Sequence, residues 1–467
     1  MAAFQQPCAA SVLEGHESGV TALALAPNQS LLLSGSADGE VRAWSPSGAG
    51  ALLSTWRGHA RGKPVWSLAF TADSALAVSA CADRTVRVWR SSDGRCTCVL
   101  SGHLKDVLHL LPSTALCPGP LLYSAGADGL LILWDCEREA RRPGAPEAHP
   151  AAAASEQAHR GAVRALLGHP RDSALCFTAG SDGRVLVWRR SIGDKQQQQL
   201  RCAAELRAAG VEAACLALHC ASASVGTLYA ATEDGCVHAW SLRMESRRVL
   251  SCAPLPLLRC GEECALRALA LSPDGDSLFA ATAHGALLSW RAHAARAGAH
   301  SSRAAAAQPW PERHSAPLKM LLLSRDGAHL YSAGLDGVLR QWRAASGRCT
   351  ARLEGHEGAV AAALLSRSGT ALFTAGADRA IRAWSVAPPP PQGRSCMDGV
   401  VAEQRRAGGA LRAHTAAALL GALQTFAAPS VFLWRRVTAA LPRRREREAE
   451  AQPTDEEHVD YHPRHAP

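Results

Sequence analysis

The stretch GHESGVTALALAPNQSLLLSGSADGEVRAW, residues 15–44, sets a pattern that returns along most of the chain. Two short apolar runs flank a turn signal at Pro27-Asn28, Asp38 opens a second turn, and the alternating run Val41–Trp44 follows. Short apolar runs between turn residues, and alternation with period two, both indicate β-strands. One such unit forms about four short strands, which are too few to bury both of their faces.

Eight tryptophans recur at intervals of 42 to 54 residues: Trp44, Trp89, Trp134, Trp188, Trp240, Trp290, Trp342 and Trp384. An aspartate precedes seven of them by six positions, and His284 takes that place in the sixth copy: Asp38, Asp83, Asp128, Asp182, Asp234, Asp336 and Asp378. Six copies carry a Ser or Thr four positions before the Asp: Ser34, Ser79, Ser124, Thr178, Ser332 and Thr374. The same six copies carry a His 22 to 25 positions before the Asp: His16, His59, His103, His159, His314 and His356. Units of this size bury their faces and protect their strand edges by stacking into a closed ring.

The order Gly-His, Ser/Thr-x-x-x-Asp and a strand that ends in Trp resembles the signature of WD40-repeat β-propellers over residues 12–384. The resemblance implies an all-β fold, a single propeller of eight blades with four antiparallel strands each; seven blades plus a divergent repeat is the alternative. The family's Asp after the Trp survives only at Trp134-Asp135. In the family the His, Ser/Thr, Asp and Trp of one blade form a buried hydrogen-bonded chain, and the six complete sets match that pattern. We interpret them as structural clips, because catalysis needs one constellation rather than six equivalent copies.

The repeat also sets the expected domain organisation. The predicted segments are an N-terminal segment over 1–11, an eight-repeat propeller over 12–387, a Pro-rich linker over 388–412, an eroded ninth repeat or packed helix over 413–436, and a charged disordered tail over 437–467. Cys8–Leu13 is the expected ring-closing outer strand. A membrane span over 415–434 is a rival interpretation, which Gln424 and Pro429 weaken. We predict mobile surface loops over 136–158, 190–206, 242–260 and 291–313.

The composition excludes several classes of protein. The chain has 467 residues, of which 47% are hydrophobic and 19% charged, so it is neither a wholly disordered protein nor a small disulfide scaffold. Its sixteen cysteines form no C-x-x-C pair, which favours buried thiols in a reducing compartment. The N-terminus lacks the basic and apolar regions of a secretory signal. We therefore predict an intracellular protein, cytoplasmic, nuclear or both, without a membrane partner.

The sequence predicts no catalytic residue, no cofactor and no metal site, because it contains no P-loop, dinucleotide fingerprint, kinase set or nucleophile elbow. Four arginines lie two positions before a repeat Trp, and we interpret them as a strand-face preference rather than a binding ring: Arg42, Arg87, Arg340 and Arg382. His458, His462 and His465 fall in the predicted disordered tail, which preorganises no metal site. In the family, the residue before the Asp lies near the rim of the channel; in this chain these residues are Ala37, Ala82, Ala127, Ser181, Glu233, Ala283, Leu335 and Ala377.

These observations predict a non-catalytic protein–protein interaction scaffold, a rigid monomeric ring that binds one or more proteins in a larger complex. An RNA-associated or ribonucleoprotein-assembly factor is the second hypothesis, based on the net charge of +9 and the basic run Arg443–Arg445. Acidic residues follow that run, which weakens the case for nucleic acid. A ubiquitin-ligase substrate adaptor is the third hypothesis. Trp134-Asp135-Cys136-Glu137 lacks the Arg of the family's Trp-Asp-x-Arg box, which weakens it.

Overall fold

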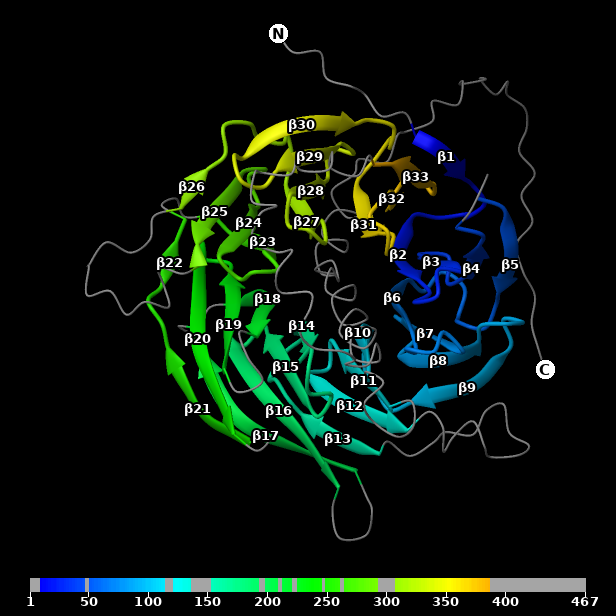
Figure 1. The fold of residues 1–467 in the computed structure, drawn as a ribbon. Helices are drawn as coiled ribbons and strands as arrows, with labels where there is room; N and C mark the ends of the chain where they lie inside the picture. Colours follow the sequence, from blue (N-terminus) through cyan, green and yellow to red (C-terminus); the bar gives the residue numbers. More distant parts are fainter. Residues whose placement is uncertain are drawn as a thin grey trace, which may run out of the picture. The chain divides into compact units, whose positions relative to one another are not determined.

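The computed structural model describes residues 9–46, 50–113, 121–135, 153–192, 198–208, 212–220, 225–245, 248–260, 264–292 and 307–386. Within these ranges the chain forms eight antiparallel sheets, which are the blades of a ring (Figure 1). The predicted all-β fold with eight blades is confirmed, and the count is eight rather than seven.

Each of the first seven blades uses consecutive strands, which follow one another from the inner strand outward. Blades 1 and 2 contain β2 (Val20–Leu25), β3 (Leu32–Ser36), β4 (Val41–Trp44), β5 (Leu52–Trp56), β6 (Val65–Phe70), β7 (Leu76–Cys81), β8 (Thr85–Arg90) and β9 (Cys96–Ser101). Blades 3 and 4 contain β10 (Val107–Pro112), β11 (Leu121–Gly126), β12 (Leu130–Asp135), β13 (Ala154–Gln157), β14 (Val163–Gly168), β15 (Leu175–Gly180), β16 (Arg184–Ile192) and β17 (Gln198–Arg207).

The second half of the ring follows the same plan. Blade 5 contains β18 (Ala213–Cys220), β19 (Val225–Thr232), β20 (Cys236–Glu245) and β21 (Arg248–Pro254), and β22 (Leu258–Arg259) also pairs with β20. Blades 6 and 7 contain β23 (Leu266–Leu271), β24 (Ser277–Thr282), β25 (Leu287–Arg291), β26 (Gln308–Pro309), β27 (Leu318–Leu323), β28 (His329–Gly334), β29 (Leu339–Arg343) and β30 (Arg348–Leu353). Blade 8 contains β31 (Val360–Leu365), β32 (Ala371–Gly376), β33 (Ile381–Ser385) and, from the other end of the chain, β1 (Ala9–Leu13).

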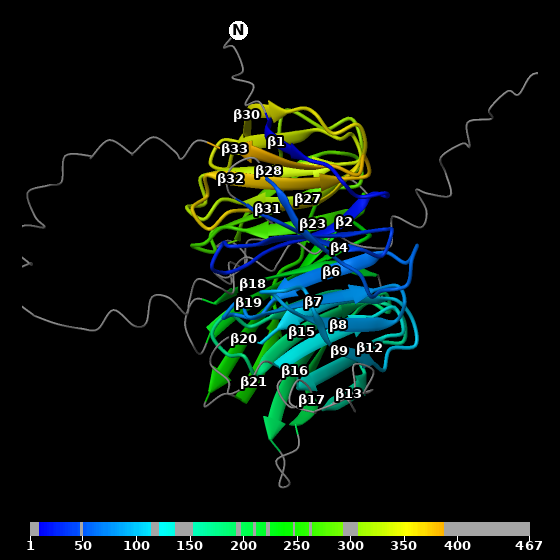
Figure 2. The same cartoon turned by 90° about the vertical axis from the view of Figure 1, so that its right-hand side faces the viewer.

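The ring is closed by the N-terminal strand. β1 pairs antiparallel with β33 (Figure 2). In this pairing Ser11 faces Ala383 and Leu13 faces Ile381. The inner strands contact one another in chain order around the ring, and β31 contacts β2 to complete the circle. Residues far apart in sequence therefore share one sheet, and the ring closes without a gap between its first and last blades.

The hydrophobic core lies between blades rather than within them. Eight clusters of buried side chains each join two neighbouring blades, including the closing cluster that contains Leu13, Trp44 and Phe373. Each repeat Trp packs against the preceding blade; Trp89, for example, shares a cluster with Leu33 of blade 1. A blade that is too small to bury both faces is thus stabilised by its neighbours.

The prediction of loops over 190–206 and 242–260 is wrong. These ranges contain most of β17 and the end of β20, β21 and β22, which are the outer strands of blades 4 and 5. β17 buries Leu200 and Leu206, whereas several of its other side chains are exposed, so its pattern is that of an edge strand rich in polar residues. The predicted loops over 136–158 and 291–313 likewise end in the outer strands β13 and β26.

The predicted linker over 388–412, the segment over 413–436 and the tail over 437–467 lie outside the described residues, so their nature stays a prediction. Within the part of the chain that is described, no helix has the length and apolar character needed to cross a bilayer. The sequence considered as a membrane span, 415–434, is not in that part.

Candidate functional site: blade clips and the channel rim

In six blades the structure brings together the His, Ser/Thr, Asp and Trp that the repeat predicts. The His Nδ1 lies 2.7 to 3.3 Å from an Asp carboxylate oxygen. The His Nε2 lies 2.7 to 2.8 Å from the Ser or Thr hydroxyl oxygen, which also accepts a hydrogen bond of 2.8 to 2.9 Å from the Trp Nε1. We call each such set a clip. It joins the start of the blade to its second and third strands.

The chemistry of the clip fixes its proton positions. An Asp carboxylate only accepts hydrogen bonds, so the His Nδ1–H must donate to it. The Trp Nε1–H donates to the hydroxyl oxygen, and the hydroxyl then donates its own proton to the His Nε2. All six hydroxyl residues are fully buried, so each network stabilises its blade only because every member has a partner.

The environment of the clip shifts the pKa of its titratable groups. Burial alone would raise the pKa of Asp38, but hydrogen bonds from His16 and the Glu40 backbone outweigh it and lower that pKa to about 2. Burial would likewise raise the pKa of Asp182, but hydrogen bonds from the Arg160 backbone and from His159 outweigh it and lower that pKa to about 2. Burial lowers the pKa of His59 and of His159, which favours the neutral imidazole.

The four arginines that precede a repeat Trp do not form an exposed ring. Arg42 and Arg340 are each only 8% exposed. The guanidinium of Arg42 lies 2.9 Å from Glu40, and that of Arg340 lies 5.9 Å from the centre of the Trp342 ring. The pairing of Arg42 with the neighbouring Glu40 and the contact of Arg340 with the indole both fit a structural role on the strand face.

Blade 6 keeps its Trp but replaces the other three members of the clip. The backbone N–H of Cys260 donates to the Gly235 carbonyl, as His159 and His314 donate to the equivalent Gly129 and Gly285 carbonyls, so Cys260 takes the place of the His. Ala280 takes the place of the Ser or Thr, and His284 that of the Asp. Trp290 is 2% exposed, and its Nε1–H has no hydrogen-bond partner among the residues that the structure describes.

Blade 5 is incomplete in a different way. Ala230 takes the Ser/Thr place, so no hydroxyl is available there to Trp240, which stacks on His238 with ring centres 5.9 Å apart. Asp234 is exposed and accepts hydrogen bonds from the Thr232 hydroxyl and the Cys236 backbone. Two neighbouring blades therefore lack the clip.

The eight residues that precede the Asp position share one backbone contact. Each donates its N–H to a carbonyl just before the inner strand of its own blade, which places all eight equivalently around the ring: Ala37, Ala82, Ala127, Ser181, Glu233, Ala283, Leu335 and Ala377. Seven of them are uncharged, and Glu233 of blade 5 is the exception.

Glu233 belongs to a group of four charges that the sequence did not predict. Its N–H donates to the carbonyl of Glu212, and its carboxylate lies 2.9 Å from Arg267 of blade 6. Glu212 forms an ion pair with Arg164 of blade 4. Both arginines occupy the second position of an inner strand, where the strand pairing shifts register. We call Arg164, Glu212, Glu233 and Arg267 the rim cluster. Burial raises the pKa of Glu212, which Arg164 opposes.

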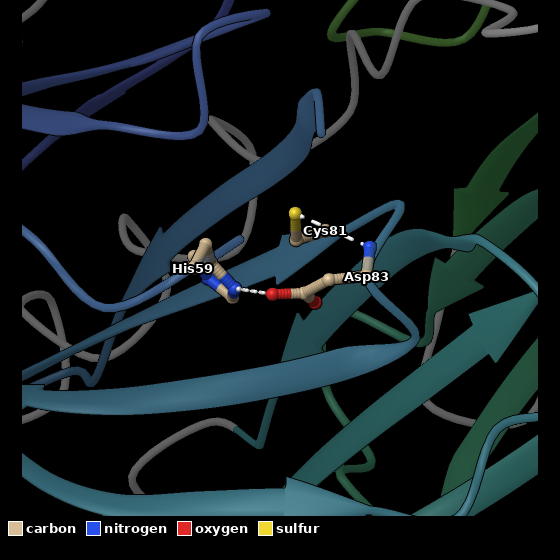
Figure 3. A group of neighbouring side chains, drawn as sticks. All are labelled: His59, Cys81 and Asp83. Carbon is tan, nitrogen blue, oxygen red and sulfur yellow. Dashed lines mark hydrogen bonds and ion pairs between the residues drawn. The ribbon is translucent and has the colours of Figure 1, made fainter. Parts of the chain in front are cut away.

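Blade 2 contains one further group of polar side chains. His59 Nδ1, Cys81 Sγ and the Asp83 carboxylate offer three atoms within 4.8 Å of one another (Figure 3). The Asp83 N–H donates to Cys81 Sγ at 3.4 Å, and Sγ donates to the Lys63 carbonyl at 3.3 Å. The sequence pattern does not reveal this group, because Cys81 is far from any second cysteine; the signal is a thiol two positions before a repeat Asp.

The structure is that of a repeat β-propeller, because it combines a closed ring of blades, a hydrophobic core between the blades and a clip that recurs from blade to blade. The family "WD domain, G-beta repeat" matches residues 8–45, 50–90, 94–135, 153–189 and 347–385. The chain belongs to the WD40-repeat β-propeller family.

Several curated proteins are similar to parts of the chain. Transducin beta-like protein 3 of Bos taurus is 31% identical over 224 residues, which are 47% of this chain and 26% of that protein. F-box-like/WD repeat-containing protein TBL1X of Mus musculus is 33% identical over 140 residues, 28% of this chain and 26% of that protein. The small ribosomal subunit protein RACK1 of Candida albicans is 38% identical over 91 residues, 18% of this chain and 28% of that protein. The chain thus spans about a quarter of the length of these relatives.

Among solved structures, the computationally designed Ika8 protein matches with a TM-score of 0.60. The match covers 81% of this chain and all of Ika8 at 22% identity, and it shows the fold alone.

Proposed function

We propose that the chain is a non-catalytic interaction scaffold, a rigid propeller that holds partner proteins in a multiprotein complex. A closed ring with six buried clips loses little conformational entropy when it binds, which suits a platform. Membership of a family of repeat propellers supports the same class of function. We also propose an intracellular location, in the cytoplasm, the nucleus or both, since a chain rich in thiols suits a reducing compartment.

The rim cluster is the observation that carries this proposal. A residue type that recurs in every blade is explained by the structure of the blade. A charged residue found at this position in one blade of eight is not explained in that way. Glu233 is the charged member of the eight equivalent rim positions, and its side chain is 36% exposed. It lies in one of the two blades that lack the clip. We therefore assign the inner rim of blades 4 to 6 as the contact surface for a protein with complementary charges.

Affinity purification of the full chain followed by mass spectrometry tests this assignment. The variant is Glu233→Ala, and the matched control is Glu205→Ala on the outer strand β17. Glu205 is also paired with an arginine, and its side chain is 37% exposed. We expect partners that are retained by the wild type and the control but lost from Glu233→Ala. If no partner is recovered reproducibly, the chain is not an interaction scaffold. If both variants retain the same partners in equal amounts, the rim cluster is not the contact surface.

The same experiment separates the two other functions predicted from the sequence. RNA in the eluate that is lost at higher salt would favour a ribonucleoprotein factor. Recovery of ubiquitin-ligase subunits would favour the substrate adaptor. The rim cluster contains two acids and two arginines, and this balance of charge favours a protein partner over a phosphate backbone.

A further inference from the structure

We propose that blade 2 contains a binding site for a thiophilic divalent metal ion such as Zn²⁺, with Cys81 Sγ, His59 Nδ1 and the Asp83 carboxylate as ligands. The three atoms lie within 4.8 Å of one another, and they are of the types that zinc prefers. The three side chains come from the start of the blade, the end of β7 and the turn that follows it (Figure 3).

The backbone aims the side chain at position 81 towards the His–Asp pair. Blades 3 and 8 carry a glycine at the equivalent position, where an added Cβ would lie 2.7 Å from His103 Nδ1 and 2.8 Å from His356 Nδ1. Gly180 of blade 4 also faces its His Nδ1, whereas an added Cβ at Gly334 of blade 7 would meet the Pro317 carbonyl instead. The direction from this position to the His Nδ1 is therefore shared by three of the four blades that have a glycine there. Across the eight blades the position holds Ser36, Cys81, Gly126, Gly180, Thr232, Thr282, Gly334 and Gly376, so blade 2 is the one with a thiol there.

The charges at this site balance. A thiolate and a carboxylate carry two negative charges, which match a divalent cation, and the imidazole is neutral. A buried site with no net charge avoids most of the cost of desolvating an unpaired ion. The side chain of Asp83 is 10% exposed, so solvent reaches the edge of the site and can supply a fourth ligand. The Thr85 hydroxyl, 2.7 Å from Asp83 Oδ1, is a second oxygen at the same place.

Binding requires three changes: a longer distance between His59 and Asp83, a shift of the imidazole proton, and loss of the thiol proton that Cys81 donates to the Lys63 carbonyl. His59 Nδ1 and Asp83 Oδ2 are 2.8 Å apart, and two ligands of a tetrahedral zinc stand about 3.4 Å apart, so this pair must open by about 0.6 Å. The metal also displaces the proton from Nδ1. The imidazole then carries its proton on Nε2, from which it donates to the Ser79 hydroxyl, and the Cys81 thiol releases one proton to solvent. The contact between His59 and β7 survives in this form, because the Ser79 oxygen now accepts from both His59 Nε2 and Trp89 Nε1. The buried Ser79 hydroxyl proton loses the acceptor it had on Nε2, which is a cost that metal binding must offset.

Blade 1 provides the matched control within the chain. Ser36 takes the place of Cys81, and its hydroxyl makes the same two contacts: it accepts from the Asp38 N–H at 3.2 Å and donates to the Ser18 carbonyl at 3.0 Å. His16 and Asp38 take the places of His59 and Asp83. At this position blade 1 has an oxygen atom and blade 2 a sulfur atom, and zinc prefers the thiolate. The two blades also differ two positions after the Asp, where blade 1 has Glu40 and blade 2 has Thr85.

The test measures zinc bound to the purified full chain by mass spectrometry of the metal, after dialysis against a weak chelator. Cys81→Ser copies blade 1, so it retains the fold and loses one equivalent of zinc. Ser36→Cys builds the same three ligands in blade 1 and gains one equivalent. Cys202→Ser removes an exposed thiol elsewhere and binds as much as the wild type. Co²⁺ replacing Zn²⁺ gives a thiolate charge-transfer band that is weaker in Cys81→Ser and stronger in Ser36→Cys.

Equal zinc content in the wild type and in Cys81→Ser would overturn the proposal, because the metal would then be held by other thiols only. Failure of a folded Ser36→Cys variant to gain zinc would also overturn it, since these three ligands would not suffice. Circular dichroism checks the fold of each variant.

Discussion

Blades 3 and 6 each bury the repeat Trp at the equivalent position of the third strand, but the hydrogen-bonding groups around its indole differ. In blade 3, Trp134 Nε1 donates to Ser124, which His103 and Asp128 hold in place. In blade 6, Trp290 is buried to nearly the same extent, and within the described ranges its Nε1 has no hydrogen-bond partner. Both blades nevertheless form four strands. Strand pairing and burial of the indole against the preceding blade therefore suffice to build a blade, and the clip adds stability to it.

The largest expected difference concerns the Asp position. Asp128→Ala leaves the buried His103 Nδ1 and the Leu104 and Leu130 N–H groups without their acceptor, so the free energy of unfolding should fall by about 3 kcal/mol or more. Asp234→Ala in blade 5 removes an exposed carboxylate and should cost about 1 kcal/mol. Urea denaturation of the two variants measures both changes in unfolding free energy. Equal changes would mean that the Asp contributes no more to a blade with a clip than to a blade without one.

The Trp position gives the next difference. Trp134→Phe and Trp290→Phe remove the same atoms from sites of nearly equal burial, but only the first breaks a hydrogen bond. We expect Trp134→Phe to lower the unfolding free energy by about 1 kcal/mol more than Trp290→Phe. Thermal unfolding of both variants tests this; a larger loss in blade 6 would point to packing rather than hydrogen bonding as the role of the indole.

The clips also make stability depend on pH. Burial lowers the pKa of His59 and His159, so the folded protein holds neutral imidazoles that the unfolded chain protonates below about pH 6.5. Their contribution is complete above that pH and is lost as the pH falls towards the folded pKa. Asp38 and Asp182, with pKa lowered to about 2, add a second loss between about pH 4 and pH 2.

Unfolding free energies should therefore be lower at pH 5 than at pH 7, and lower again at pH 3. His159→Gln should show a smaller change between pH 7 and pH 5 than the wild type. An unchanged slope in this variant would mean that the clip histidine is protonated equally in the folded and unfolded states.

The smallest effect tests whether a clip can be partly restored. Ala280→Ser places a hydroxyl opposite Trp290 Nε1, where the other blades have theirs, and should raise the unfolding free energy by up to about 1 kcal/mol. Ala281→Ser buries a hydroxyl on the other face of the same strand, away from Trp290 Nε1, and should destabilise the protein. Changes in melting temperature of opposite sign would support a stabilising hydrogen bond between the new hydroxyl and Trp290. A lower melting temperature in both variants would argue against it.

The sequence predicted the parts of the molecule that repeat. The spacing of His, Ser/Thr, Asp and Trp gave the number of blades and the members of the clips, because each clip lies within one unit of about 45 residues. β17 and β21 escaped prediction because outer strands are half exposed and follow no strict alternation of apolar residues.

The features that do not repeat could not be predicted. Arg164 and Glu212 meet across two blades, and so do Glu233 and Arg267, so only the closed ring brings them together. Cys260 takes the His place of blade 6 although it lies six positions before the inner strand, whereas His159 lies four before its own. Cys81 became a candidate ligand only when the backbone showed that its side chain faces the His–Asp pair.

Amide hydrogen exchange on the intact chain tests the contrast between clipped and unclipped blades most directly. The pairs β10–β11 of blade 3 and β23–β24 of blade 6 have strands of equal length, six residues each, and the same register shift. Because local opening in blade 3 must break a complete buried network, we predict slower exchange in β10–β11 than in β23–β24. Equal protection of the two pairs, or faster exchange in blade 3, would contradict a stabilising role for the clip.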